Sequence, residues 1–139
     1  MMSTNVNQKW AKDAQNQSRL SFGLAVTSLA QKDEKIVAVS SDTIDLMGLR
    51  EMMRLFPERI LETGIAEQNA MGIASGLATT GMRPYVCGYA PFITARSMEQ
   101  LRNDIAYANQ PVVIGAACSG ITLAVSGGTH HAIEDLALM

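Results

Sequence analysis

Residues 64–76, GIAEQNAMGIASG, place one carboxylate at the start of a run of small, mostly apolar residues. The run predicts a helix with Glu67 in its first turn, where the helix dipole stabilises a negative charge by about 0.3–1 kcal/mol. A carboxylate at a helix start can also exchange a proton with a bound ligand. Both interpretations of Glu67 are open from this stretch alone. Gly72 and Gly76 leave a flat strip on the same helix that permits close contact with another helix.

A second group with chemical potential lies in residues 127–139, GGTHHAIEDLALM. If Thr129 caps a helix, His130 and Glu134 are one turn apart, so Glu134 can orient the imidazole. The same spacing lets a histidine and a carboxylate share a metal, but no third ligand is evident, and we predict no metal site in this chain. A third interpretation is that these are ordinary polar residues at a helix start.

The elements that must position these residues alternate between strand and helix. Short β-branched or apolar runs predict strands at 35–40, 59–64, 83–88 and 111–117, and helical spacing predicts helices at 10–30, 46–56, 66–80, 94–108 and from 129 onward. This alternation predicts an α/β fold, with a mainly parallel sheet between two helical layers. Ligands of such sheets bind at the carboxyl ends of the strands, where Glu67 and the 118–130 loop would meet.

Composition supports one globular domain. The chain has 139 residues, of which 47% are hydrophobic and 17% charged, and its net charge is −2. No basic block and no long apolar segment is present, so we expect neither a nucleic-acid nor a membrane partner. Cys87 and Cys118 lack metal or redox spacing and are predicted to be buried thiols of a cytoplasmic protein. We expect a flexible tail at 1–8 and a domain at 9–139 that is incomplete at its C-terminal end.

Three motifs in fixed order carry a resemblance to a known family. They are GIAEQN…GIASGLATTGMRPYV, YAPFITARSMEQLRNDIAYANQPVVIG and GGTHHAIEDLALM. Together they closely resemble the pyrimidine-binding domain of transketolase, from about residue 19 to the last residue. The resemblance implies a thiamine-diphosphate-binding fold of the pyrimidine-domain type, with a three-layer α/β/α architecture.

The resemblance implies that Glu67 hydrogen-bonds N1′ of the thiamine aminopyrimidine, favouring the imino tautomer whose nitrogen removes the C2 proton of the thiazolium. Phe92 matches an aromatic residue that packs on the pyrimidine ring, although its type alone is equally typical of a core residue. Asp42, in VSSD, resembles an aspartate that lines the cofactor site. These three residues are the expected cofactor contacts, and Glu67 is the expected proton-transfer group.

The resemblance also implies substrate contacts. His130 matches a histidine suited to hydroxyl contacts and proton transfer, so it is both a catalytic and a substrate-binding candidate. Arg19 resembles an arginine that holds the sugar phosphate, and a guanidinium group fits that oxyanion. A solvated arginine on the first helix is the alternative for Arg19.

Some family positions differ in this chain. Leu46 stands where a phosphate-binding hydroxyl is usual, Ser126 replaces an aspartate, and AACSGI lacks a common histidine. These differences touch substrate binding more than cofactor activation. The GGTHH form looks more like split transketolases, whose two halves are separate chains.

No G-D-G…N motif, which in the family carries the metal and the diphosphate, occurs in the sequence. We therefore expect Mg²⁺ or Ca²⁺ to be held mainly by a partner subunit with the diphosphate-binding domain. The isolated chain is predicted to be inactive, and the assembled protein to be a homodimer or hetero-oligomer.

The predicted function is to supply the pyrimidine-side half of a thiamine-diphosphate-dependent transketolase, which moves a two-carbon ketol unit from a ketose phosphate, or a related sugar, to an aldose. Two other thiamine enzymes remain alternatives, a 2-oxo acid dehydrogenase β-subunit and a deoxyxylulose phosphate synthase. EQN followed by RNDIAYANQPV favours transketolase over both. A non-catalytic assembly module is the third alternative, which the differences at Leu46 and Ser126 favour and the presence of Glu67 and Phe92 opposes.

Overall fold

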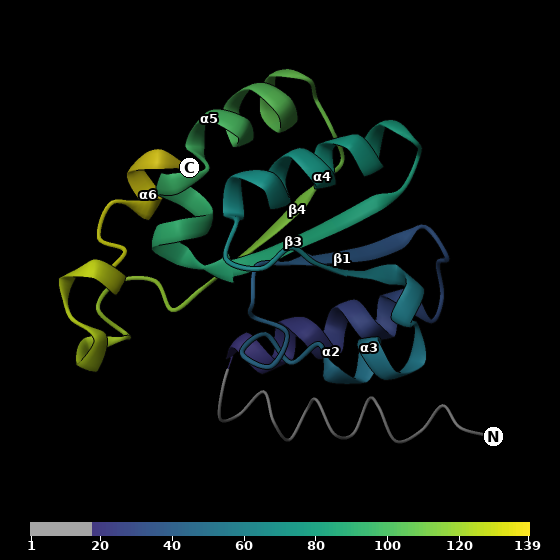
Figure 1. The fold of residues 1–139 in the computed structure, drawn as a ribbon, viewed down its shortest axis with the longest axis horizontal. Coiled ribbons are helices and arrows are strands. Elements are labelled where there is room, and N and C mark those ends of the chain that lie inside the picture. The colour runs from purple at the N-terminus through teal and green to yellow at the C-terminus, as the bar shows by residue number, and fades with distance from the viewer. Residues whose placement is uncertain (1–17) are drawn as a thin grey trace.

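A computed structural model of the chain describes residues 18–139, as a four-stranded parallel sheet between two layers of helices (Figure 1). The strands are β1 (Ile36–Ser40), β2 (Ile60–Glu62), β3 (Arg83–Tyr89) and β4 (Val113–Ala117), in the order β2-β1-β3-β4. The predicted α/β fold with a parallel sheet is confirmed. The expected tail at 1–8 and the first part of the 10–30 helix lie outside the described residues.

The helices divide between the two faces of the sheet. They are α2 (Ser18–Ala30), α3 (Arg50–Leu55), α4 (Glu67–Thr79), α5 (Met98–Gln100) and α6 (Asp135–Leu138). Helices α2 and α3 cover one face, and α4 and α5 cover the other (Figure 1). Two π-helical stretches, Phe92–Arg96 and Leu101–Tyr107, flank α5, and 3₁₀ turns form at Pro57–Arg59, Ala124–Ser126 and Gly128–His130. Within residues 18–139, no helix has the length and apolar character needed to cross a bilayer.

A hydrophobic core lies on each side of the sheet, which explains why all five residues of β1 are buried. Val26, Met52 and Cys87 belong to the core under α2 and α3. Met71 and Ile93 belong to the core under α4 and the π-helical stretches. Strands covered on both faces consist of continuous apolar runs, so the IVAVS pattern of β1 follows from its central position.

Close packing fixes the start of α2 against the sheet. A Cβ atom at Gly23 would overlap the backbone carbonyl of Met47, and one at Gly115 of β4 would lie 2.6 Å from the Phe22 ring. Both glycines therefore let α2 approach its neighbours closely. This contact brings Arg19, one turn before Gly23, to the carboxyl end of β4.

Three predicted helices differ from the observed ones. Helix α3 begins at Arg50 instead of residue 46, because Gly48 has a φ of +69° that a helix cannot accommodate. The 94–108 segment is helical but largely π-helical. The helix predicted from Thr129 is wrong, because Ala132 pairs with Gly120 through two backbone hydrogen bonds that hold this segment extended. Helix α6 begins only at Asp135.

Candidate active site

The sheet topology marks the edge where a ligand is expected. The chain runs from β1 outward to β2, then crosses through α4 to β3 on the other side of β1. Open α/β sheets bind ligands at such a reversal, beyond the carboxyl ends of the strands. Residues that follow β2, β3 and β4 meet at this edge and form the cluster Glu67, Tyr89, Phe92, Arg96 and His130.

Glu67 is the first residue of α4, and only 3% of its surface is exposed. Its Oε2 atom accepts a hydrogen bond of 2.7 Å from Nη1 of Arg96. A carboxylate so deeply buried requires a charged partner, because desolvation otherwise opposes ionisation strongly. The sequence therefore placed Glu67 correctly at the helix start, and the structure adds a partner from 29 residues further along the chain.

Phe92 lies beside Glu67 through the same arginine. The Arg96 guanidinium carbon is 4.4 Å from the centre of the Phe92 ring, a cation–π contact. Phe92 begins and Arg96 ends one π-helical turn, which lets the two side chains meet. Such turns are rare and frequently occur at functional sites. Phe92 is half-buried here and is not an ordinary core residue.

His130 completes the cluster from the loop that follows β4. Its ring centre is 5.1 Å from that of Phe92 and 6.1 Å from that of Tyr89, with edge-to-face geometry in both pairs. The hydroxyl of Thr129 lies 2.9 Å from Nδ1 of His130. The expected helical spacing between His130 and Glu134 does not form, so the prediction that Glu134 orients the imidazole is wrong; Thr129 contacts the ring instead.

The cluster has the chemistry that an aminopyrimidine requires. Such a ring is flat and carries hydrogen-bonding nitrogens, so it needs a carboxyl group at its edge and an aromatic face beside it. Glu67 and Phe92 offer these two features side by side. The structure already holds one flat nitrogenous group, the Arg96 guanidinium, between them. The residues present therefore fit the pyrimidine half of thiamine diphosphate.

Asp42 lies on a different part of the same edge. It is exposed, has a φ of +56°, and donates its backbone N–H to Oε1 of Glu62 over 2.5 Å. The same oxygen accepts a hydrogen bond from the backbone of Gly64. Glu62 thus joins the loops after β1 and β2, an organising role that the sequence did not reveal.

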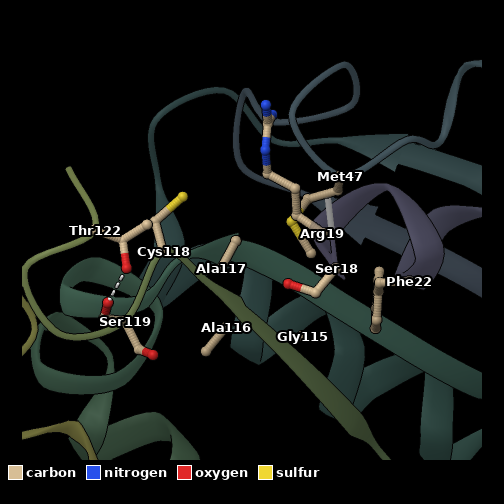
Figure 2. Close-up of a pocket in the computed structure, with 10 residues that line it drawn as sticks. All are labelled: Ser18, Arg19, Phe22, Met47, Gly115, Ala116, Ala117, Cys118, Ser119 and Thr122. Carbon is tan, nitrogen blue, oxygen red and sulfur yellow. Dashed lines mark hydrogen bonds between the residues drawn. The ribbon is translucent and has the colours of Figure 1, made fainter. Parts of the chain in front are cut away.

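Arg19 lines a cavity of about 540 Å³ between the start of α2 and the end of β4 (Figure 2). Its guanidinium donates to the backbone carbonyl of Leu46 over 3.1 Å. Ser18, Ser119 and Thr122 contribute hydroxyl groups to the walls. None of the cluster residues lines this cavity, so Arg19 and His130 belong to separate parts of the site. An arginine among hydroxyl groups is a donor set suited to a phosphate.

The two cysteines differ in environment. Cys87 is fully buried in β3, and burial raises the pKa of its thiol to about 12. Cys118 is only half-buried, so the prediction that both thiols are buried is wrong for this residue. Figure 2 shows Cys118 on the β4 side of the cavity, across from Arg19.

Alkylation is expected to distinguish these thiols. At pH 8 the Cys87 thiolate is populated to only about one part in 10⁴, and the thiolate is the reacting form. We expect iodoacetamide to label Cys118 alone in the folded chain and both cysteines in urea, as measured by peptide mass spectrometry. Labelling of Cys87 under native conditions would contradict its burial, and Cys118→Ser is the matched control.

Sequence reasoning missed Arg96, the central residue of the cluster, and assigned no role to Tyr89. The available signal was the four-residue spacing from Phe92 to Arg96. Within residues 18–139, no group of three or more His, Cys, Asp or Glu side chains is arranged to hold a metal ion.

Comparison with known proteins gives a consistent result. Residues 14–139 match the family model described as transketolase, pyrimidine binding domain. The chain is 40% identical over 121 residues to one subunit of the apulose-4-phosphate transketolase of Phocaeicola vulgatus, covering 87% of this chain and 39% of that protein. It is 39% identical over 118 residues to the 1-deoxy-D-xylulose-5-phosphate synthase of Aquifex aeolicus, covering 85% of this chain and 18% of that protein.

A solved structure titled "Split gene transketolase, inactive beta4 tetramer" superposes with a TM-score of 0.76 at 40% identity, covering 88% of this chain and 39% of that one. The chain thus spans about two-fifths of the split transketolase proteins that it matches and about a fifth of the synthase.

Proposed function

The chain belongs to the transketolase pyrimidine-binding domain family, and on that basis we propose that it supplies the pyrimidine side of a thiamine-diphosphate site. One observation carries the proposal: the buried carboxylate of Glu67 lies at the start of α4, in the same cluster as Phe92 and His130. Assembly alone would not require a carboxylate that is 3% exposed beside an aromatic face.

Each cofactor contact has a distinct role in this proposal. Glu67 hydrogen-bonds N1′ of the pyrimidine and holds or releases the proton there. Phe92 packs on the ring and excludes water from it. Asp42 lines the rim after β1, where Glu62 fixes its backbone. When bound, thiamine diphosphate supplies the electron sink that carbon–carbon cleavage in a ketose requires.

The proposed reaction transfers a two-carbon ketol unit from a ketose phosphate to an aldose phosphate. His130, with Thr129 against its ring, contacts substrate hydroxyl groups and moves a proton. Arg19 binds the phosphate in the cavity at the end of β4. The name of the Phocaeicola vulgatus relative, a transketolase for a sugar phosphate, supports this substrate class.

The proposal includes a partner subunit. Two relatives are named as a subunit of a transketolase and as a transketolase C-terminal section, which are both parts of split enzymes. A partner with the diphosphate-binding domain would hold Mg²⁺ or Ca²⁺, and the isolated chain would be inactive. The assembly would be an oligomer in the cytoplasm, and the two free cysteines suit that reducing compartment.

The likeness to the Aquifex aeolicus synthase favours a second candidate, a deoxyxylulose phosphate synthase. Both candidates would use Glu67 in the same way but differ in the donor. The partner subunit would first be captured with this chain from an extract of the source organism. The complex would then receive either a ketose phosphate or pyruvate as donor, each with an aldose phosphate acceptor.

The proposal expects product from the ketose phosphate and none from pyruvate. Turnover of pyruvate would favour the synthase or a 2-oxo acid dehydrogenase. A complex that assembles but processes neither donor would support a non-catalytic module.

A further inference from the structure

Arg96 contacts both residues on which the proposed cofactor site depends. Its Nη1 atom donates to Oε2 of Glu67 at 2.7 Å, and its guanidinium carbon lies 4.4 Å from the centre of the Phe92 ring. Because one planar group makes both contacts, it covers the face of Phe92 nearest to Glu67. A pyrimidine that hydrogen-bonds Glu67 and packs on that face must occupy the same volume.

The chemistry of the two groups is also alike. A guanidinium is flat, delocalised and presents N–H donors along an N–C–N edge. An aminopyrimidine presents a similar edge, with a ring nitrogen next to an amino-bearing carbon. A site that holds one of these groups between a carboxylate and an aromatic ring is therefore suited to hold the other.

We propose that Arg96 competes with the aminopyrimidine of the cofactor for Glu67 and Phe92, and that its side chain must leave both when the cofactor binds. This inference rests on the proposed function and adds a residue that controls cofactor loading. Arg96 is a positioning residue in this scheme, since it acts on Glu67 and not on the substrate.

The side chain is placed to make such a movement. The Arg96 side chain is 45% exposed, whereas that of Glu67 is 3% exposed. Arg96 ends the π-helical turn, so its side chain can rotate into solvent while the backbone stays in place. Glu67 and Phe92 would remain where they are, held by α4 and by the packing of His130.

The contact also explains how a buried carboxylate is kept charged and oriented. Leaving Glu67 without a partner would be costly, because its solvation by water is largely lost. Arg96 supplies that partner, and the pyrimidine replaces it on binding. The exchange lowers the apparent affinity by the fraction of time that Arg96 occupies the site.

The test is calorimetric titration of thiamine diphosphate, with excess Mg²⁺, into the complex of this chain with its partner subunit. Arg96→Ala removes the competing group, and we expect it to bind the cofactor about 3–10-fold more tightly, as for a site that Arg96 occupies about 70–90% of the time. Arg96→Lys keeps a charge near Glu67 but lacks the flat face, so its gain is expected to be smaller. Arg102→Ala, an exposed arginine later in the same helical region, is the matched control with unchanged affinity.

The outcomes separate the two proposals. Equal or weaker binding by Arg96→Ala, with native circular dichroism and assembly, would overturn the competition and leave the proposed function intact. If Arg96→Ala does not fold, equal or weaker binding by Arg96→Lys overturns it in the same way. Failure of every complex to bind thiamine diphosphate would overturn the proposed function and this inference together.

Discussion

Replacing Glu67 by Gln is expected to lower kcat of the assembled enzyme about 10²–10⁴-fold, the usual contribution of a positioned proton-transfer group. Gln has nearly the same shape and still forms hydrogen bonds, but it cannot take up or release a proton at this position. Because Glu67 is buried at the start of α4, no water-exposed carboxylate replaces it directly. The measurement is steady-state turnover with a ketose phosphate donor at saturating cofactor.

The control for this prediction is Glu34→Gln. Glu34 is exposed and precedes β1, so it lies at the opposite edge of the sheet. It should leave kcat unchanged. The Glu67→Gln chain should still assemble with the partner subunit and show a native thermal transition. Turnover within about threefold of the unmodified enzyme would remove Glu67 from the chemistry, since general acid–base effects are larger than that.

Replacing His130 by Asn is expected to lower kcat/KM about 10²-fold, at the lower end of the range for proton-transfer groups. The imidazole lies over Phe92 and Tyr89, with Thr129 against Nδ1, so its ring is held in one orientation at the edge of the cluster. Asn keeps a hydrogen-bonding group near Thr129 but loses the ring. The loss should appear in kcat/KM for the sugar, because His130 is proposed to contact substrate.

The matched control is His131→Asn, which changes the neighbouring imidazole outside the described aromatic cluster. It is expected to keep kcat/KM within a few-fold of the unmodified enzyme. Thiamine diphosphate affinity, measured by calorimetry, should change little in His130→Asn. A large loss of cofactor affinity with unchanged kcat/KM would instead assign His130 to cofactor packing through Phe92.

Local patterns predicted much of the fold. Continuous β-branched runs predicted β1 and β4, since strands covered on both faces must be apolar throughout. The small apolar residues after Glu67 predicted α4 almost to its ends, and the resemblance brought Glu67, Phe92 and His130 together as candidates. Their mutual proximity in the structure agrees with that grouping, although their roles stay predictions.

Tertiary contacts decided what local patterns could not. The backbone pairing of Ala132 with Gly120 holds a segment extended that Thr129 and its neighbours predicted to be helical. Arg96 lies 29 residues from Glu67, and no helical or strand period relates residues at that distance. The π-helical turn that brings Arg96 over Phe92 has no established sequence signature here. The most informative contact of the site was therefore the least predictable.

The central claim is that this chain supplies one half of a thiamine-diphosphate site, with Glu67 as its proton-transfer group. Calorimetric titration of thiamine diphosphate, with excess Mg²⁺, into the chain, its partner subunit and their complex tests this claim most directly. We expect strong binding by the complex and much weaker binding by either half alone, with the difference arising from Glu67 and Phe92. Equal binding by the partner alone and by the complex would contradict the claim, because this chain would then contribute nothing to the cofactor site.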